Sequence, residues 1–165
     1  MKKLYGIFAV LFLFLSIQAF SKDYKFTAAN LMVTAPANWT VEQEGEVVIL
    51  TVNSEEIAIV FTIIHADALD KALEAGIEEI QKQYSDLKLD DVKEETLEHV
   101  TVVYTDGKAK RDDGSGKLFD VELTVALVPG SNDNFLFIHG VATTEALNKF
   151  SKDIGTILNS LKPIK

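Results

Sequence analysis

The segment KLFDVELTVALVPGSNDNFLFIHGVA, residues Lys117–Ala142, contains two apolar runs on either side of a polar turn. Successive side chains of a strand point to opposite faces, so alternate positions in each run share a face. The first run places five apolar residues on one face: Phe119, Val121, Leu123, Val125 and Leu127. The second run places Phe135, Phe137, His139 and Val141 opposite Leu136, Ile138, Gly140 and Ala142. Pro129-Gly130-Ser131-Asn132-Asp133 has turn chemistry, so the segment predicts a central antiparallel hairpin.

Two other apolar runs, Glu46–Val52 and Ile57–Ile64, precede the hairpin and are joined by a polar turn at 53–56. Neither run alternates, which is typical of strands covered on both faces. Further strands are expected at Tyr24–Phe26, Leu31–Thr34 and Val100–Lys110. The charged run from Val92 to Glu98 predicts an edge strand or extended segment. Trp39 follows a Pro-containing turn, and we expect it to cap an edge of the core.

Two segments have the apolar spacing of amphipathic helices. The first extends from Asp67, the expected N-cap, to Leu87, and its stripe is Leu69, Leu73, Ile77, Ile80, Tyr84 and Leu87. The second begins near Thr143 or Thr144, ends before Lys162-Pro163 and directs six residues inward: Leu147, Phe150, Ile154, Ile157, Leu158 and Leu161. For Gly155, inside this helix, we expect a close approach to the sheet.

The order of elements predicts an α+β fold with an antiparallel sheet and a helix on each face, an α/β/α sandwich. Because no linker or repeat interrupts it, residues 22–165 are predicted to form a single domain.

Residues 1–21 have the layout of a secretory signal peptide. Lys2 and Lys3 precede an uncharged stretch, and Ala19 and Ser21 are small residues at the positions a signal peptidase requires. We therefore expect cleavage between Ser21 and Lys22, and a secreted or periplasmic protein. The alternative is a retained membrane anchor, since about 20 apolar residues can span a bilayer.

Composition excludes several functional classes. Removing the two lysines of residues 1–21 changes the formal net charge from −9 to −11, and Arg111 is the only arginine. Nucleic-acid binding requires clustered basic residues, so it is not expected, and neither is stable membrane insertion of the mature chain. The absence of cysteine excludes disulfides, thiolate metal sites and thiol nucleophiles.

Three motifs taken in order resemble the PsbP-like superfamily. They are Val33-Thr34-Ala35-Pro36-Ala37-Asn38-Trp39, the helix ending in Gln83-Tyr84-Ser85-Asp86, and the terminal Ile157-Leu158-Asn159-Ser160-Leu161-Lys162-Pro163. The superfamily includes the extrinsic photosystem II protein, Mog-type Ran-binding proteins and many bacterial secreted proteins. The resemblance implies the same α/β/α sandwich over Tyr24–Pro163 and a role in binding or assembly; it supplies no active site.

No catalytic, cofactor-binding or metal-binding residue is predicted. The histidines His65, His99 and His139 lack the spacing of a helical metal site. Asp112-Asp113-Gly114-Ser115-Gly116 lacks the ligand pattern of an EF-hand and predicts a solvated hairpin loop, although calcium binding there stays open. The carboxylates of the charged run are interpreted as an exposed edge: Asp90, Asp91, Glu94, Glu95 and Glu98.

These observations favour a secreted, periplasmic, non-enzymatic binding or assembly domain with an envelope protein as partner. The alternative is a small-ligand-binding protein or an enzyme that uses a pocket between sheet and helix. A deep pocket in the folded protein would favour this alternative, whereas a flat surface would favour protein binding.

Overall fold

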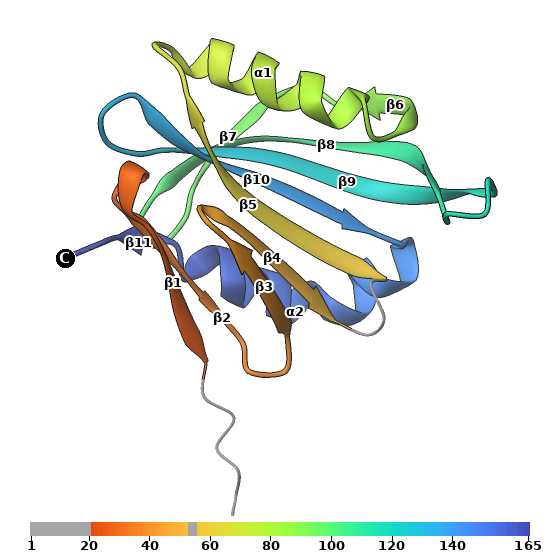
Figure 1. The fold of residues 1–165 in the computed structure, drawn as a ribbon, viewed down its shortest axis with the longest axis horizontal. Helices are drawn as coiled ribbons and strands as arrows, with labels where there is room; N and C mark the ends of the chain where they lie inside the picture. The colour runs from red at the N-terminus through yellow and green to blue at the C-terminus, as the bar shows by residue number, and fades with distance from the viewer. Residues whose placement is uncertain (1–20, 53–55) are drawn as a thin grey trace, which may run out of the picture.

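Strands β9 (Leu118–Pro129) and β10 (Asn134–Ala142) form the expected hairpin at the centre of the molecule (Figure 1). Their register pairs Phe137 with Leu127, and Val141 with Leu123. Nearly all of the apolar side chains of the hairpin are buried on both faces, as expected for strands with cover on each side. The alternation in the sequence therefore identified the two faces of the hairpin correctly.

The structure is a computed structural model that describes residues 21–52 and 56–165. The expected signal peptide, apart from Ser21, and most of the expected turn at 53–56 lie outside the described residues. The main sheet has eight strands in the order β3-β4-β5-β10-β9-β8-β6, with β7 also paired to β8. Its remaining strands are β3 (Thr40–Glu44), β4 (Val47–Val52), β5 (Ile57–His65), β6 (Ser85–Leu89), β7 (Lys93–Thr96) and β8 (Thr101–Asp112). All neighbouring pairs are antiparallel, as predicted.

A second, three-stranded sheet contains β1 (Lys22–Phe26), β2 (Leu31–Ala35) and β11 (Lys162–Pro163), and a short 3₁₀ helix (Thr27–Ala29) follows β1. It packs into the same apolar core as the main sheet, where the rings of Phe26 and Phe61 lie 5.9 Å apart. Trp39 is buried at the edge of this core, as expected, and its indole N–H donates to Asp153 Oδ2 at 3.2 Å. β3, by contrast, was not expected, because TVEQE contains a single apolar residue.

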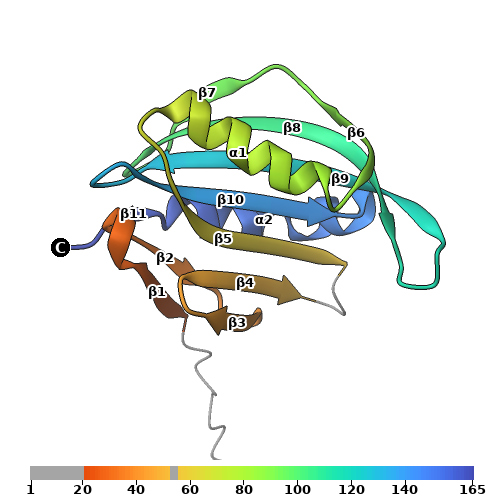
Figure 2. The same cartoon turned by 45° about the horizontal axis from the view of Figure 1, so that its top comes forward.

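Helices α1 (Leu69–Gln81) and α2 (Thr144–Asn159) lie on opposite faces of the main sheet (Figures 1 and 2). This arrangement confirms the predicted α+β fold with a helix on each face. α1 packs mainly on β9, β5 and β10, and α2 lies on the other face beside the small sheet. Within the described ranges, no helix has the length and apolar content required to cross a membrane.

The first helix is shorter than the apolar stripe predicted. α1 ends at Gln81, and Ser85–Leu89 form strand β6 on the edge of β8. Tyr84 and Leu87 still pack in the apolar clusters under α1. They are therefore packed on the side that the predicted stripe indicated, although Tyr84 lies in a turn and Leu87 in a strand. The early end of the helix is explained by the edge of β8, whose backbone groups would be unpaired without β6. Strand β6 supplies their hydrogen-bond partners. The N-cap is also different: it is Ala68, and Asp67 forms an ion pair with Lys71 at 2.8 Å.

The second helix begins as predicted, since Thr143 Oγ1 caps it by accepting from the backbone N–H of Ala146 at 3.2 Å. Two details of the prediction were wrong. Leu147 does not point into a filled core but remains 38% exposed. Gly155 makes no close approach to the sheet, because an added Cβ would meet nothing within 4 Å. The sequence periodicity locates the apolar side of α2 but not its distance from the sheet.

The prediction that β4 and β5 are covered on both faces holds for one face only. Their residues alternate between buried and half-buried side chains, and the half-buried ones, such as Ile49 and Val60, lie on the side of α1. α1 packs over β9, β10 and part of β5. It leaves the corner of the sheet around Ile49 and Val60 without a helix above it.

Two helical glycines provide a matched test of this packing. At Gly76 in α1 an added Cβ would overlap the buried ring of Phe137, whereas Gly155 in α2 faces open space. We expect Gly155→Ala to raise the free energy of unfolding by about 1 kcal/mol through helix propensity. We expect Gly76→Ala to lower it by about 1–3 kcal/mol, because overpacking outweighs propensity. Urea denaturation of both variants measures the difference, and equal gains would show that α1 does not rest on Phe137.

Candidate functional site

An apolar cavity of about 530 Å³ lies between α2 and the face of the main sheet beneath it. Its sheet wall comes from β5, β8, β9 and β10, and its helix wall from three apolar residues of α2: Leu147, Ile154 and Leu158. The apolar side chains of the sheet wall include Ile57, Ile59, Val102, Ala126, Ile138 and Ala142. This volume falls within the range of about 300–1,000 Å³ that is usual for small-molecule sites.

Gly140 explains part of the hollow. It lies on β10 between Ile138 and Ala142, and its missing side chain would point into the cavity. An added Cβ would be 3.8 Å from the carbonyl oxygen of Thr124, which is ordinary contact, so packing does not require glycine here. A glycine inside a strand weakens it and often marks a place where another group approaches. Gly140 is therefore the sequence feature that relates most directly to this cavity, and it was not among the predicted site residues.

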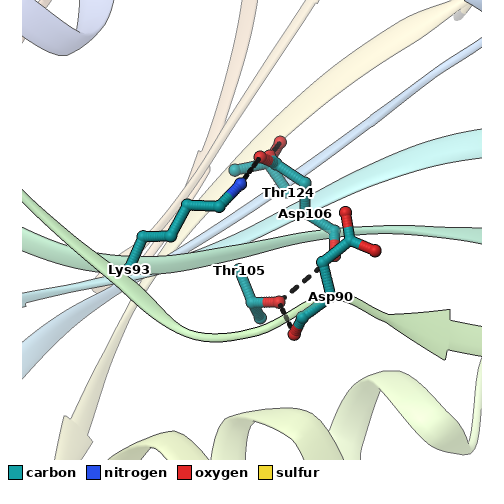
Figure 3. Close-up of polar contacts among 5 residues, drawn as sticks. All are labelled: Asp90, Lys93, Thr105, Asp106 and Thr124. Atoms are coloured by element: carbon teal, nitrogen blue, oxygen red, sulfur yellow. Dashed lines mark hydrogen bonds and ion pairs between the residues drawn. The ribbon is translucent and has the colours of Figure 1, made fainter.

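Charged side chains surround the mouth of the cavity. Asp106 on β8 accepts a hydrogen bond from Thr124 Oγ1 at 2.8 Å, and it forms an ion pair with Lys93 Nζ at 3.5 Å (Figure 3). The hydroxyl of the buried Thr105 donates to the backbone oxygen of Asp90 at 2.8 Å. These contacts attach the segment before β7 to β8, so this part of the rim is held in place.

Both signs of charge occur at the rim. The lysines Lys88 and Lys108 line the mouth with the carboxylates Asp90, Glu95, Asp106 and Glu122, and Lys108 Nζ lies 3.6 Å from Glu122 Oε1. The run from Asp90 to Glu98 was predicted to be an exposed edge, and all five of its carboxylates are exposed. It did not predict that Asp90 and Glu95 lie at a cavity mouth, since this depends on how β7 pairs with β8.

The cavity offers apolar contacts at its walls and charged groups of both signs at its mouth. Among the described residues that line it, there is no histidine, serine or cysteine to form a nucleophile and base pair. A wall of apolar side chains with a charged rim suits a molecule with an apolar body and a polar end.

The three histidines occupy separate environments. His65 is exposed at the end of β5, and His99 is exposed with its Nε2 3.6 Å from Glu98 Oε1. His139 is 6% exposed on the α1 face of β10. Its ring and that of Tyr84 pack edge to face, with their centroids 5.4 Å apart. Within the described residues, no group of three or more histidine, aspartate or glutamate side chains is placed to hold a metal ion.

The loop at Asp112–Gly116 uses its carboxylates for its own backbone. Asp112 Oδ1 accepts from the N–H groups of Gly114 at 2.7 Å and Gly116 at 2.9 Å. Asp113 Oδ1 accepts from Ser115 N at 2.8 Å and Ser115 Oγ at 2.6 Å, and these bonds lower the pKa of Asp113. Such turns are typical of a solvated hairpin loop.

His139 predicts a pH dependence of stability. Burial, aided by the charge of Arg111, lowers the pKa of His139 from 6.5 to about 4. Between these values the unfolded chain binds more protons, so this part of the stability is complete above pH 6.5 and is lost as the pH falls through 4. At about 1.4 kcal/mol per pKa unit, we expect a loss of roughly 3 kcal/mol. Urea denaturation from pH 7 to pH 4 should show a flatter profile for His139→Phe, whereas His65→Asn at an exposed site should follow the wild type. Parallel profiles for all three proteins would contradict the prediction.

Comparisons with known proteins bear on the fold. No family model and no curated protein sequence matches this chain. Solved structures do match: cyanobacterial PsbP (CyanoP) from Synechocystis sp. PCC 6803 has a TM-score of 0.62 at 10% identity, over 88% of this chain and 93% of that one.

Two proteins from other organisms match with similar coverage. The Ran-binding protein Mog1p of Saccharomyces cerevisiae has a TM-score of 0.54 at 10% identity, over 88% of this chain and 96% of that one. LpqN of Mycobacterium tuberculosis, a protein involved in cell envelope biogenesis, has a TM-score of 0.52 at 14% identity, over 86% and 84%. At such identities the likeness concerns the fold alone, and it agrees with the resemblance found in the sequence motifs: this chain has the PsbP-like fold.

Proposed function

We propose that this chain is a secreted, periplasmic, non-enzymatic binding protein, and that the cavity under α2 takes a small molecule with an apolar body and a polar end. The observation that carries the proposal is the cavity itself, about 530 Å³ with mainly apolar walls. A flat surface would instead have favoured a protein partner, the first of the two alternatives that the sequence left open. Structural relatives that bind Ran or take part in envelope biogenesis support a binding role.

The shape of the site supports a small molecule rather than an exposed protein interface. One wall of the site comes from the helix and the other from the sheet. Of the apolar residues named in these walls, Leu147 alone is an exposed large hydrophobic residue. An apolar molecule that enters gains the hydrophobic free energy of the wall, at about 25 cal/mol per Å² of apolar surface removed from water. The charges at the rim then offer partners to its polar end.

The cavity can be tested by filling it. We expect Gly140→Leu to place its side chain in the cavity without a backbone clash and to keep the protein folded. Binding of the neutral dye N-phenyl-1-naphthylamine, followed by fluorescence, should weaken at least about tenfold, which corresponds to 1.4 kcal/mol. Gly155→Leu adds the same side chain on α2 outside the cavity and is the matched control.

Two results would contradict the proposal. One is that wild-type protein does not bind the dye saturably; the other is that the two leucine variants bind it equally well.

Native mass spectrometry of protein purified from its own envelope would identify the natural occupant of the cavity. A co-purifying protein with no small molecule would favour the assembly role instead.

The proposed location has its own test. If residues 1–21 are a signal peptide, N-terminal sequencing of the protein from the envelope fraction should begin at Lys22. An intact Met1 in the membrane pellet would show a retained anchor and would exclude secretion.

A further inference from the structure

A second hollow, of about 330 Å³, lies on the opposite face of the main sheet, where α1 leaves β4 and part of β5 uncovered. Its floor is a row of paired residues across neighbouring strands: Ile49 lies opposite Val60, and Val60 lies opposite His139. Tyr84, just after α1, and Arg111 on β8 belong to its wall. This hollow and the cavity under α2 lie on opposite faces of the sheet, because alternate residues of β10 point to the two sides. Ala58 and Val141 line both of them.

The guanidinium of Arg111 has no hydrogen-bond or ion-pair partner among the described residues, although Arg111 is partly buried. It is also the only arginine of the chain, whose other positive side chains are lysines. A guanidinium is planar and always charged, and it presents paired N–H donors that match a carboxylate. A partly desolvated guanidinium without a partner is suited to an anion from outside the chain.

The groups around Arg111 add hydrogen-bonding capacity without a second positive charge. His139 is buried, and its Nε2 has no hydrogen-bond partner among the described residues. Burial lowers the pKa of His139 to about 4, so the imidazole is neutral at pH 7 and offers one donor and one acceptor. Burial raises the pKa of Tyr84, and the charge of Arg111, which lines the same hollow, partly opposes this rise.

The negative charge in this hollow lies at its far end. Glu42 is exposed on β3, and four strands separate β3 from β8, which carries Arg111. Its repulsion of an anion beside Arg111 is therefore screened by solvent. Between the two charges the floor is apolar, with Ile49, Ala58 and Val60.

We propose that this hollow binds a small carboxylate with an apolar body, with the carboxylate at Arg111 and the body on the floor of β4, β5 and β10. A monocarboxylate suits the site better than a phosphate, because one guanidinium balances one charge and the overall protein charge is −9. The proposal does not depend on the cavity under α2.

Benzoate is the probe for the test, measured by calorimetry on the full mature protein. We expect saturable binding that weakens at least about tenfold in Arg111→Gln, since a charge-assisted bidentate pair contributes more than 1.4 kcal/mol. Lys110→Gln is the matched control: it removes the same charge one residue away, from the other face of β8. Gly140→Leu should leave benzoate binding unchanged, which separates this site from the cavity under α2.

An NMR titration provides a second readout. Benzoate should raise the pKa of the His139 imidazole and shift the signals of Tyr84, because a bound anion favours the protonated ring. The proposal is overturned if benzoate does not bind, or if Arg111→Gln and Lys110→Gln weaken it equally. It is also overturned if phosphate displaces benzoate at equal concentration, or if benzylamine binds more tightly through Glu42.

Discussion

The pairing of β9 with β10 is the constraint on which the rest of the structure depends. Their long antiparallel register brings Val125, Leu127 and Phe137 to one face and Ala126, Leu136 and Ile138 to the other. Each face must be covered, because these side chains are apolar on both sides. α1 packs on the first face, while α2 and the small sheet pack on the second. The remaining strands add to the two edges of this hairpin.

The helices are too few to cover a sheet of this width. Seven strands side by side, about 4.8 Å apart, form a surface far wider than a single helix, whose diameter with side chains is about 10 Å. The small sheet supplies further cover on the face of α2, but among the elements formed by residues 21–52 and 56–165 no second one lies beside α1. Hollows therefore remain where cover ends, one under α2 and one beside α1. Both candidate sites follow from the same mismatch between sheet and helices.

Structure formed by residues close in sequence was predictable, whereas contacts that depend on strand register were not. The hairpin, both helices and their opposite faces could be inferred from alternation and from helical periodicity. The end of α1 could not, because Tyr84 and Leu87 continue the stripe although they leave the helix. The row that joins Ile49, Val60 and His139 depends on two strand pairings over about ninety residues of sequence, and the walls of the cavity likewise depend on strand pairings. For this reason, His139 could be placed in a strand but not in a site.

Glycines show the same limit at single positions. Gly76, Gly107 and Gly140 are alike in the sequence, as small residues inside regular elements, but their surroundings differ. The ring of Phe137 fills the space above Gly76, and the backbone of Lys88 lies 2.5 Å from where a Cβ of Gly107 would be. These two glycines permit close packing of α1 and β6 on the sheet, whereas the space above Gly140 stays open. Because the fold does not require glycine at position 140, the open space there supports the proposal that a small molecule occupies the apolar cavity.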